Sequence, residues 1–70
     1  MKKLDLHGVY HEDVDRLVEN FVLLNECPLE IITGNSFVMQ RLVKEVLNKH
    51  HFKYRYKNYI NLGALIVWDY

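Results

Sequence analysis

Two amphipathic segments, each preceded by a short strand-like segment, constrain the fold of this chain more than any other feature. In residues 14–24 and again in residues 37–47, apolar side chains recur at three- and four-residue spacing, which predicts two helices. Residues 2–6 are strand-like, because Leu4 and Leu6 alternate with Asp5, and residues 29–33 are a short run rich in β-branched residues, which predicts a second strand. Two strand–helix units therefore follow one another along the chain.

Local signals support the ends of these helices. Glu12 and Asp13 suit the positive end of the first helix dipole, and Pro28 lies beyond that helix, where a helix does not easily continue. Asn35 or Ser36 can cap the second helix. The apolar positions are Val14, Leu17, Val18, Phe21, Val22 and Leu24 in the first helix, and Phe37, Val38, Leu42, Val43, Val46 and Leu47 in the second.

Two further strands complete the predicted fold. Residues 52–56 alternate aromatic with basic side chains, and residues 62–68 are almost continuously apolar, with a hairpin connection over 57–61. Right-handed crossovers would place both helices on one face of the sheet. We therefore expect an α/β fold, a two-layer βαβαββ sandwich with a four-stranded mixed sheet and two helices on one face. Residues 1–70 would form this single domain.

Composition excludes several classes of protein. Half of the residues are hydrophobic and 26% are charged, which is typical of a globular rather than a disordered chain. The apolar runs are too short to span a bilayer, and no signal peptide is recognised, so we expect no membrane partner. The single cysteine, Cys27, can form no internal disulfide, which fits a soluble protein of the reducing cytoplasm.

The formal net charge is zero, but the charges are distributed unevenly. Residues 1–36 hold three Lys and Arg against seven Asp and Glu, whereas residues 37–70 hold six against two. This distribution permits one positive face, which a polyanion such as nucleic acid would need. The alternative is a set of ordinary solvated faces without a partner.

The end of the first strand carries the strongest candidate for chemistry, in the run Leu4-Asp5-Leu6-His7-Gly8. Strand alternation puts Asp5 and His7 side by side, opposite the leucines, and Gly8 lets the chain turn or approach a ligand closely. An unperturbed imidazole titrates at about pH 6.5, so we assign His7 as a general acid or base. Asp5 would orient His7, act as a base itself, or hold a divalent cation such as Mg²⁺ or Mn²⁺.

The turn Thr33-Gly34-Asn35-Ser36 is the candidate phosphate seat, because exposed N–H groups at a helix N-terminus bind anions. Four basic residues are candidate phosphate contacts: Arg41 and Lys44 on the second helix, and Lys53 and Arg55 on the third strand. Tyr54 and Tyr56 would face the core, on the opposite side of that strand. The four histidines have no zinc-site spacing, so we predict no structural metal.

Taken together at their spacing, these motifs resemble the small MutS-related (Smr) domain. The family is known for an LDLHG-type motif, a TGxG or HGxG motif and a late glycine-containing strand. This chain has the first motif at residues 4–8, then Thr33-Gly34, Arg41 on the second helix, and Gly63-Ala64. It departs from the family where Ser36 replaces a second glycine and where a double glycine is reduced to Gly63.

The resemblance implies a fold like that of the C-terminal domain of a bacterial translation initiation factor, with DNA or RNA as the partner. Many Smr domains are described as endonucleases. We therefore expect an endonuclease that nicks or cleaves DNA or RNA with His7 and Asp5, aided by a larger protein partner or the ribosome. The missing second glycine favours an alternative, a non-catalytic module that docks on nucleic acid or a ribonucleoprotein. A third reading is a protein-interaction domain without affinity for nucleic acid.

Overall fold

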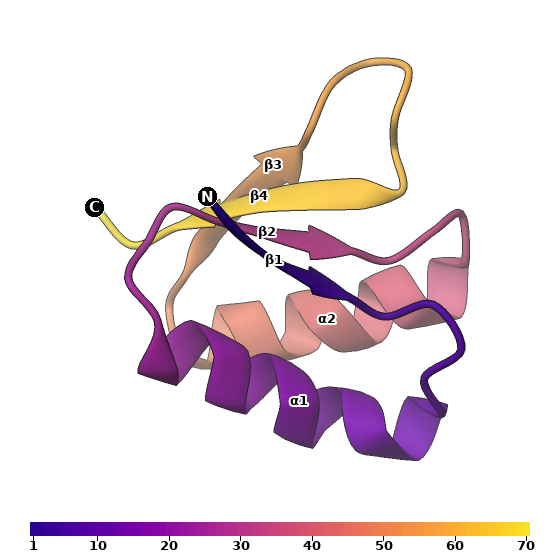
Figure 1. The fold of residues 1–70 in the computed structure, drawn as a ribbon, viewed down its shortest axis with the longest axis horizontal. Helices are drawn as coiled ribbons and strands as arrows, with labels where there is room; N and C mark the ends of the chain where they lie inside the picture. Colours follow the sequence, from indigo (N-terminus) through magenta and orange to yellow (C-terminus); the bar gives the residue numbers. More distant parts are fainter.

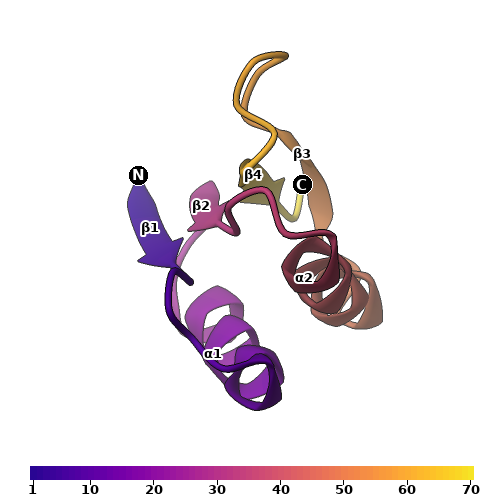
Figure 2. The same ribbon diagram turned by 90° about the vertical axis from the view of Figure 1, so that its right-hand side faces the viewer.

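A computed structural model describes residues 1–70, which form one four-stranded sheet and two helices. The elements are β1 (Lys2–Asp5), α1 (His11–Leu24), β2 (Leu29–Ile32), α2 (Phe37–Lys49), β3 (Lys53–Tyr56) and β4 (Ala64–Trp68). The strand order is β1-β2-β4-β3, with β1 parallel to β2 and the other neighbours antiparallel. Both helices cover the same face of the sheet (Figure 1, Figure 2). The predicted two-layer α/β sandwich is confirmed.

The two most apolar strands occupy the centre of the sheet. Leu29 and Ile31 of β2, with Leu65 and Val67 of β4, turn towards the helices and are fully buried. The edge strands β1 and β3 instead carry lysines and an arginine, which oppose edge-to-edge pairing with another chain. The polarity of each strand thus matches its place in the sheet.

The hydrophobic core lies between the sheet and the helices. The helices contribute Val14, Val18 and Val22 from α1, and Met39, Val43, Val46 and Leu47 from α2. The predicted apolar stripes are wrong at the helix ends, because Leu24 is 79% and Phe37 is 87% exposed, and Val38 is exposed as well. A strand of 4 residues spans about 13 Å, whereas a helix of 13 residues spans about 20 Å, so the helix ends extend past the sheet.

The loop between β3 and β4 is longer than predicted. The N–H of Lys57 donates to the carbonyl of Ala64 at 2.9 Å, and the chain leaves the ladder beyond this pair. Leu62 and Gly63, which were predicted to begin the last strand, therefore lie in the connection. We call residues 57–63 the β3–β4 loop.

Candidate functional site

Three chain segments meet at one edge of the sheet. The carboxyl ends of the parallel strands β1 and β2 lie beside the start of antiparallel β4, because Ile32 pairs with Ala64. A Cβ atom added to Gly63 would lie 3.0 Å from the Cα and the carbonyl carbon of Gly34, so the two backbones are in direct contact. We call residues 5–8, 33–36 and 63 the glycine edge. Ligands of open α/β sheets bind at such carboxyl ends.

The β1–α1 turn (residues 6–9) brings Asp5 and His7 together. The N–H of Val9 donates to the carbonyl of Leu6 at 3.1 Å, and Gly8 takes a φ of +75°, which favours glycine. One carboxylate oxygen of Asp5, Oδ1, accepts from the His7 backbone N–H at 2.9 Å and lies 2.6 Å from Nδ1 of the ring. The predicted adjacency is confirmed, although a turn rather than strand alternation produces it.

Hydrogen bonds from His7 keep Asp5 ionised. The backbone bond is the largest cause of a pKa below the ordinary value of Asp5, and the side-chain bond adds to it. Both side chains are exposed, so a ligand can reach them directly. Because Nδ1 of His7 faces the carboxylate, the imidazole is held with Nε2 directed away from Asp5.

The second ring nitrogen of His7 lies against the β2–α2 turn (residues 33–36). A Cβ atom added to Gly34 would lie 3.5 Å from Nε2, and Gly34 itself takes a φ of +67°. A side chain at this position would be strained by the positive φ, and its Cβ would be in van der Waals contact with the imidazole. The structure thus brings Asp5, His7 and the predicted phosphate seat to one place.

Within that seat, only some of the backbone N–H groups are available to an anion. The N–H groups of Thr33 and Gly34 both donate to the carbonyl of Gly63, at 2.8 and 3.0 Å, so the fold already uses them. Ser36 caps α2 by accepting from the N–H of Met39 at 3.1 Å. The N–H groups of Asn35 and Ser36 and the first two N–H groups of α2 have no hydrogen-bond partner in the chain, and the first helical turn contains no acidic side chain.

Gln40 is a polar residue outside the apolar positions predicted for the second helix, but it is only 7% exposed. Its amide nitrogen donates to the carbonyl of Gly34 at 3.2 Å and to the carbonyl of Leu62 at 3.0 Å. Its amide oxygen accepts from the hydroxyl of Tyr56 at 3.3 Å. Gln40 therefore ties the β2–α2 turn, the β3–β4 loop and strand β3 to α2. Helical periodicity carries no signal for this role.

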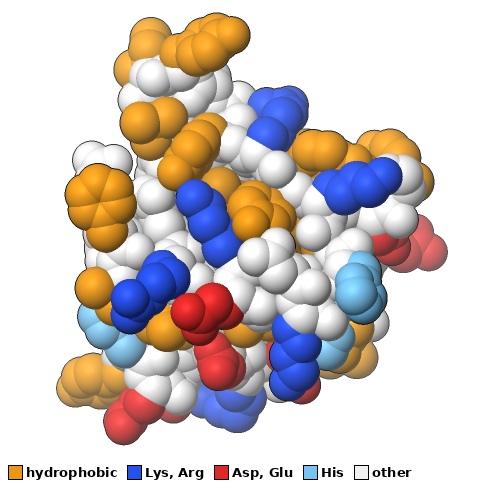
Figure 3. Space-filling model, turned by 180° about the vertical axis from the view of Figure 1, so that it is seen from behind, with side chains coloured by type: hydrophobic (Ala, Val, Ile, Leu, Met, Phe, Trp, Pro, Cys, Tyr) orange, Lys and Arg blue, Asp and Glu red, His pale blue; other side chains and the backbone are white.

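The four predicted basic contacts do not reach the Asp5–His7 pair. Each has another neighbour: Arg41 lies 3.9 Å from Glu45, Lys44 donates to Tyr56, Lys53 to the carbonyl of Tyr70, and Arg55 to the carbonyls of Tyr56 and Lys57. Lys53 and Arg55 lie on β3, the strand farthest from β1. Seen from behind, Lys and Arg side chains are interspersed with acidic and hydrophobic ones rather than joined in one patch (Figure 3).

Both tyrosines of β3 face the helices, but only Tyr54 packs against the core as predicted, because Tyr56 is 37% exposed. The hydroxyl of Tyr54 donates to the side chain of Asn48 at 3.0 Å, and Tyr56 bonds to Gln40. The ammonium of Lys44 lies 4.9 Å from the centre of the Tyr56 ring, where a cation is attracted to the π system. Lys53 and Arg55 consequently point to the face of the sheet that carries no helix.

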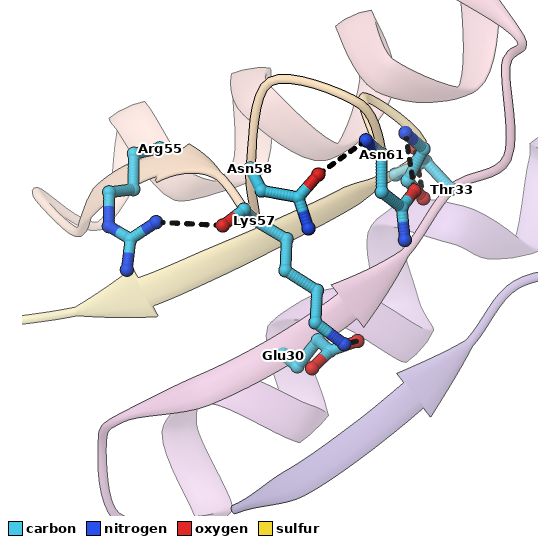
Figure 4. A network of polar contacts seen from close by, with 7 residues as sticks. Glu30, Thr33, Arg55, Lys57, Asn58 and Asn61 are labelled. Atoms are coloured by element: carbon cyan, nitrogen blue, oxygen red, sulfur yellow. Dashed lines mark hydrogen bonds and ion pairs between the residues drawn. The ribbon is translucent and has the colours of Figure 1, made fainter.

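A buried carboxylate on that open face was also missed. Glu30 of β2 is buried, and the ammonium of Lys57 reaches back over the sheet to its Oε2 at 3.3 Å (Figure 4). The sequence signal for this pair was weak, since the two residues lie 27 positions apart. The pair anchors the start of the β3–β4 loop to the sheet.

No three His, Cys, Asp or Glu side chains are grouped to hold a metal ion. Neither helix has the length and hydropathy required to cross a bilayer. Comparison of the chain with protein-family models, with curated proteins and with solved structures finds no match. Fold and site therefore define a small α/β domain with an exposed Asp–His pair beside an open helix N-terminus.

Proposed function

We propose that this domain binds nucleic acid at the glycine edge and cleaves its phosphodiester bonds. The placement of His7 is the observation that supports this most directly: Nδ1 faces Asp5 at 2.6 Å, and Nε2 faces the turn before α2. A proton-transfer group thus lies beside a helix N-terminus that has free N–H donors.

Phosphodiester cleavage requires proton transfer and stabilisation of negative charge in the transition state. Nε2 of His7 would take a proton from the attacking oxygen or give one to the leaving oxygen. The carboxylate of Asp5 would hold the ring in position and stabilise the imidazolium form. The N–H groups of Phe37 and Val38 would bind a phosphate oxygen, supported by the helix dipole.

A divalent cation fits the same carboxylate. The Oδ1 atom of Asp5 is occupied by His7, whereas its other oxygen has no hydrogen-bond partner in the chain. Mg²⁺ is commonly held by one or two carboxylates together with substrate phosphates. Asp5 would supply the protein ligand for Mg²⁺ or Mn²⁺, and the cation would contribute positive charge next to the bound phosphate.

A second candidate function is a module that binds nucleic acid without cleaving it. The specific observation in its favour is that Arg41, Lys44, Lys53 and Arg55 all contact other residues and none of them forms a hydrogen bond or an ion pair with Asp5 or His7. Without a bound cation, backbone N–H groups would be left to stabilise the negative charge of a transition state. Both functions are compatible with an Smr-like domain that works in the cytoplasm with a larger protein or the ribosome.

The test is cleavage of labelled single- and double-stranded DNA and RNA in the presence of Mg²⁺, Mn²⁺ or EDTA. Wild type would be compared with His7→Ala and Asp5→Asn. His51→Asn is the matched control, because His51 is exposed near the far end of α2 and has a φ of +63°, which asparagine tolerates. We expect His7→Ala to lower the cleavage rate by about 10²- to 10⁴-fold, with unchanged nucleic-acid affinity.

Three other outcomes decide against parts of the proposal. Binding without cleavage by the wild type would select the non-catalytic module. Equal cleavage by His7→Ala and wild type would show that His7 is not a catalytic residue. Absence of binding at low salt would reject both functions and leave the protein-interaction domain.

A further inference from the structure

The β3–β4 loop presents large apolar side chains to solvent. Tyr59 is 100% and Ile60 is 96% exposed, and Leu62 is nearly half exposed. The loop projects away from the sheet and both helices in two perpendicular views (Figure 1, Figure 2). These side chains contribute little to the core of the fold, and adjacent exposed apolar residues of this kind mark interaction sites.

Hydrogen bonds hold this loop in a defined shape. The side-chain oxygen of Asn58 accepts from the N–H groups of Ile60 and Asn61, at 2.9 and 2.6 Å. The side-chain oxygen of Asn61 accepts from the N–H of Gly63 at 3.1 Å, and Arg55 donates to the carbonyl of Lys57 at 3.1 Å (Figure 4). A loop ordered in this way loses less conformational entropy when a ligand binds.

A cavity of about 490 Å³ lies at the base of the loop. It is lined by Arg55, Tyr56, Lys57, Asn58, Tyr59 and Leu62. Its volume falls within the range of small-molecule sites, and its lining residues include two tyrosines and two cationic residues but no carboxylate. The chemistry of the lining suits a ligand that has a planar apolar part and a negative charge.

Arg55 is the cation best placed to meet that negative charge. No carboxylate lies within 4.0 Å of its guanidinium, which donates from one nitrogen, Nη1, to two backbone carbonyls. Lys57, by contrast, is paired with Glu30 at 3.3 Å. The charge of Arg55 is thus uncompensated, and its second terminal nitrogen has no partner in the chain.

We infer that this cavity binds an unstacked nucleotide of single-stranded nucleic acid, with the base on the ring of Tyr59 and the adjacent phosphate on Arg55. The inference rests on the proposed nucleic-acid binding and names its substrate class. Bases stack on exposed aromatic side chains in a sequence-tolerant way, whereas the bases of a duplex are already stacked on each other. A second copy of the chain would bring like charges together at Arg55 and Lys57, which disfavours self-association through this surface.

The cavity and the glycine edge are mechanically connected. Gln40 donates to the carbonyl of Leu62 in the loop and to that of Gly34 in the β2–α2 turn, at 3.0 and 3.2 Å. Its amide oxygen also accepts from Tyr56, which lines the cavity. One buried side chain therefore fixes the loop relative to the turn that faces His7.

The test is fluorescence anisotropy at low salt with labelled oligothymidine of about 12 nucleotides, an abasic strand of equal length and a duplex. We expect wild type to bind oligothymidine more tightly than the duplex. Tyr59→Ala should weaken binding of oligothymidine by at least about fivefold and leave binding of the abasic strand unchanged. Tyr59→Phe, which keeps the ring, should bind like wild type. Leu24→Ala, another exposed apolar truncation at the end of α1, is the matched control.

Arg55→Gln keeps an amide donor for the loop carbonyls and removes the charge, so it should weaken binding of both single strands and reduce the salt slope by about one. If wild type binds oligothymidine but Tyr59→Ala binds it equally well, the nucleotide cavity is rejected while binding at the glycine edge stands. Equal weakening of all three ligands by Tyr59→Ala would also reject it. If wild type binds no nucleic acid, the proposed function and this inference fail together.

Discussion

The two strand-to-helix turns lie at the same edge of the sheet, but the helices that follow them begin with opposite capping and charge. After the β1–α1 turn, α1 begins without a side-chain cap at Tyr10 and carries Glu12 and Asp13 in its first helical turn. After the β2–α2 turn, α2 begins with Ser36 as a cap and has no acidic side chain in its first helical turn.

This difference assigns separate tasks to the two turns. The carboxylates of Glu12 and Asp13 compensate the positive end of the α1 dipole and would repel a phosphate. The corresponding end of α2 stays open to an anion. The parallel strands β1 and β2 therefore lead to two adjacent helix N-termini. The N-terminus of α2 can bind phosphate, and the turn before α1 supplies Asp5 and His7.

The close contact between Gly63 and the β2–α2 turn predicts the largest effect on stability. Gly63→Ala would put a Cβ atom 3.0 Å from backbone atoms of Gly34, so the β2–α2 turn and the loop must separate. We expect a loss of about 1–3 kcal/mol in the free energy of unfolding, measured by urea denaturation. Gly8→Asn is the control, because no atom lies within 4 Å of the added Cβ and asparagine tolerates its positive φ. Equal losses for the two variants would contradict the difference in packing between the turns.

An acidic residue in the first turn of α2, like those in the first turn of α1, should weaken nucleic-acid binding. Phe37 is the first residue of α2 and is 87% exposed, so Phe37→Glu costs little packing. Compared with the neutral Phe37→Gln, it should lower the affinity about tenfold, because its carboxylate competes with phosphate at the helix end. The same change should raise the free energy of unfolding by about 0.3–1 kcal/mol. A lower affinity of Phe37→Glu together with a higher stability would identify the N-terminus of α2 as the anion site. Equal affinities of Phe37→Glu and Phe37→Gln would place binding elsewhere.

The smallest predicted effect is on stability at low pH. It concerns the β1–α1 turn, beside which Asp5 titrates, and not the β2–α2 turn. His7 lowers the pKa of Asp5 in the folded state. As the pH falls, the unfolded state therefore binds more protons than the folded state. The stabilisation is present above the ordinary value of 3.8 and is lost as the pH falls through the lowered folded pKa. Thermal melts from about pH 5 to about pH 2 should show a smaller decrease for Asp5→Asn than for wild type.

Glu19 contributes to acid lability with the same sign and serves as the reference. His50 lies 2.9 Å from its carboxylate and lowers its pKa, which links α1 to the end of α2. Glu19→Gln should therefore also reduce the decrease at low pH. A wild-type melting temperature that rises on acidification would contradict both assignments.

Much of the fold follows from patterns that act over a few residues. Alternating side chains predicted the two edge strands, short runs of apolar and β-branched residues predicted the two central strands, and helical spacing predicted the buried valines of α1. The helix ends were predicted wrongly, because Phe37 and Leu24 obey the helical pattern but lie beyond the reach of the short strands. Gln40 and Glu30 were missed because polar residues in amphipathic patterns are normally solvated.

The sequence alone determined the contacts of the candidate site that join residues close together in the chain. Asp5 and His7 are two residues apart, so a single turn suffices to join them, and Ser36 caps the helix that it precedes. The tertiary structure decided the rest: the contact between Gly34 and Gly63, the role of Gln40 across 22 residues, and the separation of Arg55 from His7. Such contacts depend on strand order and on the packing of α2, which local propensity does not encode.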